Sequence, residues 1–343
     1  MSTRDILSKS FSLSPLHLSR SWLCLLALIL AAVTAQVSAQ TCASRGDLDT
    51  PYCDVNRDLV ADTPATTIDP SNIVVGISAV EDHATAQRTY GPMLKTLGSC
   101  LKKDVVLYHN TTERQVLEGM RGGTIHIGQF ATGGTMFAVN FAGAVPFAAK
   151  GQLSAKKMDS YTLMLIVKAD SNFRKPTDLI GRTVAHTTPT SNSGNLAPRA
   201  LFPELGLTPD KDYKVEYSKK HDNSINGVRM GVYDAAAIAS DVFDRLVAKG
   251  EIKRNQFRIL FESEEFPSDA FAYAHNLSPA LVTQIKKCVL DYKFPDAMAQ
   301  QLEGNNRFFP VDYNREWRVI RLIAKASGTV MNKETYNKII APK

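Results

Sequence analysis

Short apolar runs alternate with segments of helical periodicity along most of the chain. Between residues 72 and 141, the pattern predicts strands at 72–77, 104–108 and 124–128, and helices at 84–98, 113–121 and 134–141. Strands separated by helices are typical of βαβ units, so this half of the pattern predicts a mainly parallel sheet.

A second series of the same kind follows. Strands are predicted at 161–168, 182–186, 214–217, 235–239 and 257–261, with helices beginning near Asp222 and covering 241–249; a strand at 270–274 then precedes helices from Ser278 onward. Two successive series in a chain of 343 residues predict two α/β lobes. We expect lobe 1 to comprise 71–160 and 271–343 and lobe 2 to comprise 161–270, with crossovers near Tyr161 and Ala270. Ligands of open parallel sheets bind beyond the carboxyl ends of the strands, which places the ligand in the cleft between the lobes.

The first 39 residues predict an export signal. Basic residues at 4, 9 and 20 precede the apolar run 22–33, and Val37-Ser-Ala39 fits a small-residue cleavage site. The apolar run is too short for a membrane span of about 20 residues. We therefore expect an exported protein cleaved near Ala39, with residues 40–70 forming a lead-in to the first lobe.

The charge of the chain argues against nucleic acid as a partner. The whole sequence carries a formal net charge of +6, and the basic residues and Asp5 of the predicted signal account for two of these charges, which leaves +4. No block of basic residues occurs, so no nucleic-acid surface is expected.

Four cysteines remain after the predicted signal is removed, an even number in a compartment that permits disulfides. Cys42 and Cys53 flank a ten-residue loop and are close enough in sequence to pair, which leaves Cys100 for Cys288. Metal binding is the alternative, but the chain has no C-x-x-C and its histidines are isolated. We predict two disulfides and no metal site.

The turn 187–195 is the most informative segment. The predicted strand 182–186 is followed by the turn Thr187-Thr-Pro-Thr-Ser-Asn-Ser-Gly-Asn195, and a predicted helix starts at Leu196. Hydroxyl side chains and free backbone N–H groups at a helix start suit a small oxyanion, because the helix N-terminus carries about half a positive charge. The alternative is an ordinary N-cap turn, since Ser and Asn are common caps.

Several motifs, taken together, carry a family resemblance. The motifs are Gly119-Met-Arg-Gly-Gly-Thr-Ile-His-Ile-Gly128, Phe130-Ala-Thr-Gly-Gly134, Asn140-Phe-Ala-Gly-Ala-Val-Pro-Phe147, Thr190-Ser-Asn-Ser-Gly194, Lys220-His-Asp-Asn-Ser224 and Tyr233-Asp-Ala-Ala-Ala237. Over residues 70 to 320, in consistent order, the chain resembles the phosphate/phosphite/phosphonate-binding proteins of ABC importers. The resemblance implies a type II periplasmic binding protein fold, with two α/β lobes, two hinge crossovers and a ligand cleft between them.

The resemblance also implies a set of ligand-binding residues. A first-lobe turn and a hydroxyl-rich second-lobe turn would clamp the oxyanion, a histidine at a helix start would add a donor, and two aspartates would recognise an amino group or a protonated oxygen. In this sequence the matching residues are Thr132 and Gly133, Ser191, Asn192 and Ser193, His221 with the adjacent Asp222, and finally Asp241 and Asp269.

Some positions depart from the family pattern or have a second interpretation. Glu113 and Phe130 stand where phosphonate binders often carry a neutral hydrogen-bonding side chain, and a carboxylate at Glu113 would repel a dianion unless it points away or pairs with Arg114. Phe130 is either a core residue or a ligand cover. Asp222 is expected as a helix N-cap rather than a ligand contact, although one residue can serve both roles. The acidic pair at 81–82 either borders the cleft or caps a helix.

The motifs favour a binding protein over an enzyme. Ser191, His221 and Asp241 are the residue types of a hydrolase, yet no G-x-S-x-G, P-loop, H-E-x-x-H or cofactor fingerprint occurs. We expect no cofactor, and as partners a small oxyanion and an ABC permease for a monomeric periplasmic protein. The alternative is a periplasmic sensor of arsenite or a related oxyanion that signals to a membrane histidine kinase.

Overall fold

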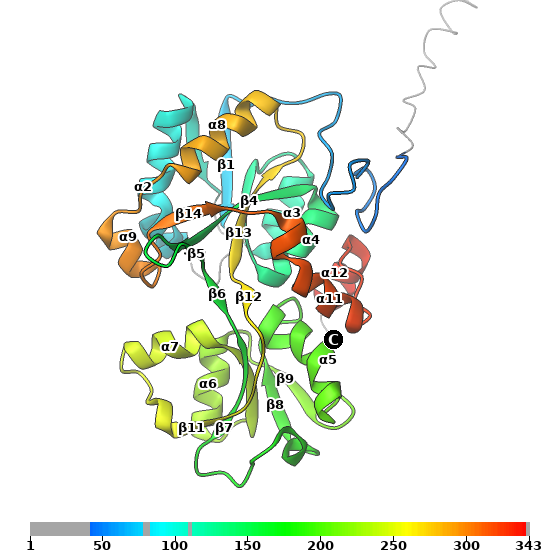
Figure 1. Cartoon of the computed structure of the whole chain (residues 1–343), viewed down its shortest axis with the longest axis vertical. Helices are drawn as coiled ribbons and strands as arrows, with labels where there is room; N and C mark the ends of the chain where they lie inside the picture. Colours follow the sequence, from blue (N-terminus) through cyan, green and yellow to red (C-terminus); the bar gives the residue numbers. More distant parts are fainter. Residues whose placement is uncertain (1–41, 78–82, 109–111, 341–343) are drawn as a thin grey trace, which may run out of the picture. The chain divides into compact units, whose positions relative to one another are not determined.

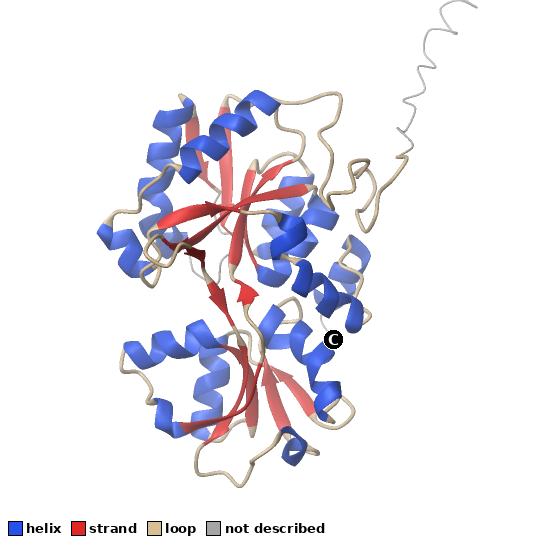
Figure 2. Ribbon diagram, in the orientation of Figure 1, coloured by secondary structure: helices blue, strands red, loops and turns tan. Residues whose placement is uncertain are grey.

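The computed structural model describes residues 42–77, 83–108 and 112–340. The predicted export signal and the acidic pair at 81–82 lie outside these residues. Within them the chain forms a seven-stranded sheet, a five-stranded sheet and a two-stranded ribbon. Helices flank the two larger sheets (Figures 1 and 2). We call the seven-stranded sheet with its helices the first lobe, and the five-stranded sheet with its helices the second lobe.

The first lobe uses two separate stretches of the sequence. Its strands run in the order β14-β4-β13-β3-β1-β2, with β5 paired to β4. The strands are β1 (Asn72–Ile77), β2 (Asp104–Leu107), β3 (Ile127–Ala131), β4 (Ala144–Gln152), β5 (Lys157–Met158), β13 (Asp269–Ala274) and β14 (Arg307–Pro310). The helices are α2 (His83–Leu101), α3 (Glu113–Arg121), α4 (Thr132–Ala142), α8 (Pro279–Leu290), α9 (Asp296–Gln301), α10 (Tyr313–Glu316), α11 (Arg318–Ala326) and α12 (Lys333–Ile340).

The second lobe is continuous in sequence. Its strands run in the order β11-β7-β10-β8-β9. They are β7 (Leu163–Lys168), β8 (Thr183–His186), β9 (Lys214–Tyr217), β10 (Ala235–Ala239) and β11 (Phe257–Glu262). The helical segments are η1 (Pro176–Leu179), η2 (Asn192–Leu196), α5 (Ala197–Leu201), η3 (Phe202–Leu205), α6 (His221–Met230), α7 (Ser240–Ala248) and η4 (Arg254–Gln256).

The chain passes between the lobes twice, as predicted. The outgoing strand β6 (Ser160–Tyr161) pairs with the returning strand β12 (Phe266–Pro267), and the two form the ribbon that links the sheets in Figure 1. Two α/β lobes with two hinge crossovers confirm the predicted fold. The strands of the predicted βαβ units, β1, β2 and β3, pair in parallel as expected. The sheet as a whole is not mainly parallel, because β13 returns from the second lobe and inserts antiparallel between β3 and β4.

The strand predicted at 124–128 is displaced toward the C-terminus. The observed strand β3 covers Ile127–Ala131, because its ladder partner is β13, with Asp269 opposite Ala131 and Tyr273 opposite Ile127. His126, just before β3, donates its backbone N–H to Val74 O at 2.9 Å, and its ring Nδ1 accepts the N–H of Val74 at 3.0 Å. The alternation of apolar residues does not show that β13 pairs with this strand, so it could not place the ends of β3.

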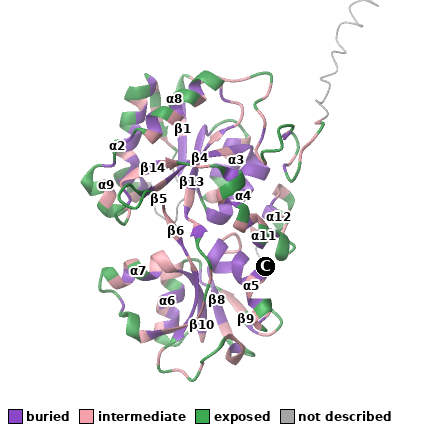
Figure 3. Ribbon diagram, in the orientation of Figure 1, coloured by how far each residue is buried: buried purple, intermediate pink, exposed green. Residues whose placement is uncertain are grey.

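The apolar composition of α4 and β10 is explained by their complete burial. All eleven residues of α4 are buried, as expected for a helix enclosed on every side, here by α3, α11 and α12. All five residues of the alanine-rich β10 are also buried, at the centre of the second sheet. Figure 3 shows this burial along the strands and exposure on the outer helices. None of the helices in the described part of the chain has the length and apolar character needed to cross a membrane.

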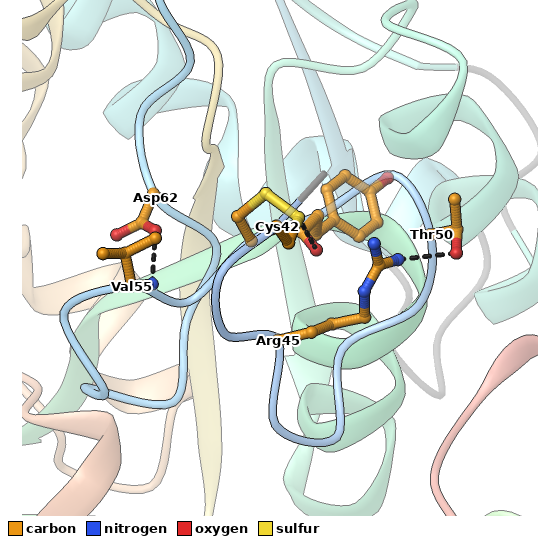
Figure 4. Close-up of a disulfide and its surroundings, with 7 residues drawn as sticks. Cys42, Arg45, Thr50, Val55 and Asp62 are labelled. Atoms are coloured by element: carbon orange, nitrogen blue, oxygen red, sulfur yellow. Dashed lines mark hydrogen bonds between the residues drawn. A yellow bond between two sulfur atoms is a disulfide. The ribbon is translucent and has the colours of Figure 1, made fainter. Parts of the chain in front are cut away.

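Both predicted disulfides are present. The Cys42–Cys53 bond closes the small loop in Figure 4, where the Arg45 guanidinium also donates to Thr50 Oγ1 at 2.5 Å. The Cys100–Cys288 bond joins α2 to α8 across 188 residues of sequence. It ties together the two separate stretches that make up the first lobe.

Candidate functional site

The first-lobe half of the site is the start of α4. This helix follows β3 through Ala131, which is extended and provides no side-chain cap. The backbone N–H of Gly133 has no hydrogen-bond partner among the described residues. Two hydrogen bonds fix the position of Thr132: its Oγ1 donates to Pro267 O at 2.8 Å, and the Trp317 indole donates to its carbonyl at 3.0 Å. The first turn of α4 therefore presents donors that no side chain satisfies.

The second-lobe half of the site is the turn between β8 and the helical segment that begins at η2. The segment opens with one π-helical turn, continues through α5 and η3, and starts earlier than the predicted Leu196. The Oγ of Ser191 accepts the N–H of Gly194 at 3.1 Å, so Ser191 is an N-cap. Asn192 and Ser193 are buried, and the backbone N–H of Ser193 has no partner among the described residues. A π turn at a functional position is a recurrent arrangement.

The two halves touch each other. A Cβ added to Gly133 would lie 2.3 Å from Thr190 O and 3.3 Å from Asn192 N. Because this distance is far inside van der Waals contact, only glycine permits the first-lobe turn to approach the second so closely. The contact brings together Thr132, Gly133 and the 191–193 turn, all of which the sequence analysis assigned to the site.

Tyr161, on the outgoing hinge strand β6, connects the two halves. Its hydroxyl donates to Thr132 Oγ1 at 2.9 Å and accepts from Asn192 Nδ2 at 3.1 Å, and the Ser193 side chain lies beside the same oxygen. Burial raises the pKa of Tyr161 to about 12, so the hydroxyl keeps its proton. We call Thr132, Tyr161, Asn192 and Ser193 the donor cluster. Tyr161 was not predicted as a site residue, because the sequence pattern placed it at the start of a long strand next to a crossover.

His221 lies at the start of α6, as predicted, next to the end of β10. Its Nδ1 accepts the N–H of Ala239 at 3.2 Å, which leaves the hydrogen of the neutral ring on Nε2. Burial, assisted by the charge of Arg245, lowers the pKa of His221 to about 4. The ring is therefore a neutral donor, and its Nε2 has no partner among the described residues.

The expectation that Asp222 caps this helix is wrong. The N-cap of α6 is Lys220, and Asp222 belongs to the first turn, where its charge suits the helix N-terminus. Its carboxylate pairs with Arg245 at 3.3 Å, and the same guanidinium lies 3.3 Å from Glu303 of the first lobe. Asp222 thus takes part in an ion pair that bridges the lobes.

The two aspartates proposed as acceptors have different surroundings. Asp241, in the first turn of α7, has a buried Oδ1 with no hydrogen-bond partner among the described residues. Burial raises its pKa to about 6, although the nearby Lys150 charge opposes this. Asp269 accepts from Lys150 at 2.9 Å and from the amide of Gln129. We call Lys150, Asp159, Asp241 and Asp269 the acidic cluster.

The structure also places the two residues that depart from the family pattern. Phe130 is fully buried, which assigns it to the core and not to a ligand cover. Glu113 forms no ion pair with Arg114; its carboxyl lies near Thr190 of the second lobe and Tyr336 of α12, and its buried Oε1 has no hydrogen-bond partner among the described residues. Burial raises the pKa of Glu113, because the charged carboxylate loses its hydration, so this carboxyl keeps its proton to a higher pH than an exposed one does.

A family model and a curated relative both match this chain in sequence. Residues 75–314 match the family model described as ABC transporter, phosphonate, periplasmic substrate-binding protein. A curated relative, the phosphate-import protein PhnD of Mycolicibacterium smegmatis, is 26% identical over 229 residues, which cover 63% of this chain and 70% of the relative.

Two solved structures have the same fold. One is a binding-protein component of an ABC phosphonate transporter from Pseudomonas aeruginosa, with a TM-score of 0.63 and 20% identity, covering 79% of this chain and 94% of the other. The second is PhnD1 of Prochlorococcus marinus in complex with methylphosphonate, with a TM-score of 0.63 and 15% identity, covering 75% and 98%. These structural neighbours identify the type II periplasmic binding protein fold, as the motifs predicted.

Proposed function

Because the chain belongs to the family of periplasmic substrate-binding proteins of phosphonate ABC transporters, we propose that it captures a small phosphorus oxyanion for an ABC importer. The candidate ligands are phosphite, a short phosphonate and phosphate. The ligand is held between Thr132–Gly133 of the first lobe and Ser191–Asn192–Ser193 of the second.

The observation that carries the proposal is the convergence of donors from both lobes. Tyr161 bonds to Thr132 of the first lobe and to Asn192 of the second, and unsatisfied backbone N–H groups of α4 and η2 lie on either side of the same contact. Two helix starts facing one point stabilise an anion through N–H dipoles without a buried cation. His221 adds a neutral donor from the adjoining helix.

Asp241 supplies the discrimination. An ionised carboxylate accepts a hydrogen bond from a P–OH group and repels an anion that carries no proton. The unpartnered, buried Oδ1 of Asp241 suits this role, because a buried acceptor without a partner is costly until a ligand donates to it. We therefore propose selection of protonated phosphorus oxyanions over sulfate.

Closure of the lobes couples binding to transport. A ligand that contacts both lobes favours the closed state, and the permease recognises that state. The names of the relatives support this class of ligand, since one is a phosphate-import protein and another holds methylphosphonate. One chain supplies both halves of the site, so we propose a monomer, which light scattering of the purified protein would test.

Export by residues 1–39 is part of the proposal. N-terminal sequencing of the protein recovered from the periplasm should begin at Gln40, immediately after Ala39. A protein that retains the first 39 residues would contradict cleavage at this position.

The direct test is calorimetric titration of the wild-type protein with phosphite, methylphosphonate, phosphate and sulfate. We expect binding of at least one of the three phosphorus anions and no comparable binding of sulfate. Absence of binding by all three would remove the proposed function.

A further inference from the structure

Lys150 is the only lysine among the described residues that pairs with two carboxylates. Its Nζ lies 2.9 Å from Asp269 Oδ1 and 3.2 Å from Asp159 Oδ2. The three side chains are 18%, 13% and 22% exposed, respectively, so the pairs are largely removed from water. The sequence gives no hint of this triad, because Lys150 and Asp269 are 119 residues apart.

Backbone contacts hold Lys150, Asp159 and Asp269 beside the donor cluster. The N–H of Asp159 donates to Lys150 O at 2.9 Å, and the carbonyl of Asp159 accepts from Ser268 at 3.2 Å. Asp269 stands opposite Ala131 in the sheet ladder, one residue before Thr132. Lys150 therefore holds its charge at the hinge, next to the proposed oxyanion position.

Both oxygens of Asp269 are already engaged. Oδ1 accepts from Lys150 and also from Ser268 Oγ, and Oδ2 accepts from Gln129. A cationic group on a ligand would have to displace the Lys150 ammonium, which would leave a buried charge without its partner. Asp241, in contrast, keeps an oxygen without a partner among the described residues and interacts with the Lys150 charge.

We propose that Lys150 is a specificity-determining residue: its ammonium group occupies the carboxylates of Asp159 and Asp269, so the site accepts phosphorus oxyanions without an amino group and rejects aminoalkylphosphonates. This inference rests on the proposed function, since it concerns the substituent of the same oxyanion. Asp241 then remains as the acceptor for a P–OH proton. Burial opposes the charge on Lys150, but the attraction of Asp269 and Asp159 outweighs it and raises the pKa of Lys150, so the ammonium persists at neutral pH.

The test compares two ligands of equal size, ethylphosphonate and aminomethylphosphonate, which differ by a methyl group and an ammonium group. Calorimetric titration of the wild-type protein should favour ethylphosphonate by about tenfold or more, because an ammonium group would have to displace Lys150 from carboxylates that are already engaged. In Lys150→Met the vacated carboxylates should favour the ammonium group and reverse the preference. The control is Lys157→Met, whose lysine pairs with Glu265 at 2.5 Å on a surface where both side chains are more than half exposed; it should keep the wild-type ratio.

The outcomes separate the inference from the proposed function. If wild-type protein binds phosphite but binds aminomethylphosphonate as tightly as ethylphosphonate, the role of Lys150 is overturned and the proposed function stands. If Lys150→Met binds phosphite and gains no affinity for aminomethylphosphonate, the role is likewise overturned. If wild-type protein binds no phosphorus anion, the proposed function fails first. Should circular dichroism show that Lys150→Met is unfolded, Lys150→Met/Asp159→Asn removes one uncompensated charge and carries the same expectation.

Discussion

The donor cluster takes its side chains from both lobes and the hinge, whereas three of the four members of the acidic cluster belong to the first lobe and its hinge edge. The donor cluster is uncharged; the Tyr161 hydroxyl bonds to Thr132 and Asn192, and the Thr132 hydroxyl donates to backbone carbonyls of the hinge. The acidic cluster is charged, and Lys150 neutralises part of it. Under the proposed function, donors from opposite lobes give affinity only when the lobes close, while the carboxylates beside them decide which anions are tolerated. We therefore propose that the donor cluster provides affinity and the acidic cluster provides discrimination.

The contact between the lobes offers the strongest way to break the donor cluster. In Gly133→Ala the new methyl group would lie 2.3 Å from Thr190 O, a backbone atom that cannot rotate away. We expect affinity for the bound anion to fall about 100-fold or more, because the closed state becomes sparsely populated. Calorimetric titration checks this. Gly91→Ala is the matched control, since its methyl group meets only the flexible side chain of Gln87, and it should bind normally.

Asp241→Asn tests discrimination instead of affinity. The amide can donate where the carboxylate could not, so sulfate should gain and phosphite should lose affinity, each by about 10- to 150-fold for one charged hydrogen bond. The ratio of the two affinities, measured by competition titration, is the readout. An unchanged ratio would remove Asp241 from the site.

The acidity of Asp241 predicts a pH dependence in the wild-type protein. Its pKa is raised to about 6 by burial, so it is largely ionised at pH 7 and protonated at pH 5. A protonated carboxyl donates to an anion, so rejection of sulfate should weaken as the pH falls from 7 to 5. Asp241→Asn should lack this dependence. Constant sulfate rejection over this range in the wild-type protein would contradict the assignment.

The smallest expected effect concerns Glu113, which joins the lobes from outside both clusters. Burial raises its pKa, so the neutral carboxyl stabilises the native state at low pH, and this contribution is lost as the pH rises through the native pKa. Glu113→Gln should therefore leave the free energy of unfolding almost unchanged at pH 4 and raise it at pH 8, by about 1.4 kcal/mol for each unit of pKa shift.

The control for this prediction is Glu118→Gln on the same helix. Its carboxylate is 39% exposed and lies 3.7 Å from Lys333. Chemical unfolding at both pH values should show no rise in stability at pH 8 for this variant. A similar rise in both variants would mean that surface charge, and not the buried carboxyl, causes the effect.

Local patterns predicted the lobes, the disulfides and the hydroxyl-rich turn. Cysteine parity sufficed for both bridges, and Ser191 is the cap that opens the hydroxyl-rich turn of the candidate site. Other contacts between residues distant in sequence could not be predicted. Lys150 contacts Asp269 only because β13 inserts beside β4. Tyr161 contacts Asn192 only because the hinge brings the lobes together. A Ser160-Tyr-Thr162 polar break in the apolar strand was the available signal for the hinge.

The most direct measurement of the central claim is a calorimetric titration of Ser193→Ala and wild-type protein with phosphite under identical conditions. Ser193 belongs to the second-lobe half of the donor cluster, and its buried side chain lies beside the Tyr161 hydroxyl. Removing one donor from a desolvated anion costs about 1.5–3 kcal/mol, so the variant should bind about 10- to 150-fold more weakly than the wild type. Equal affinity of the two proteins for phosphite would contradict a phosphorus oxyanion held at this turn.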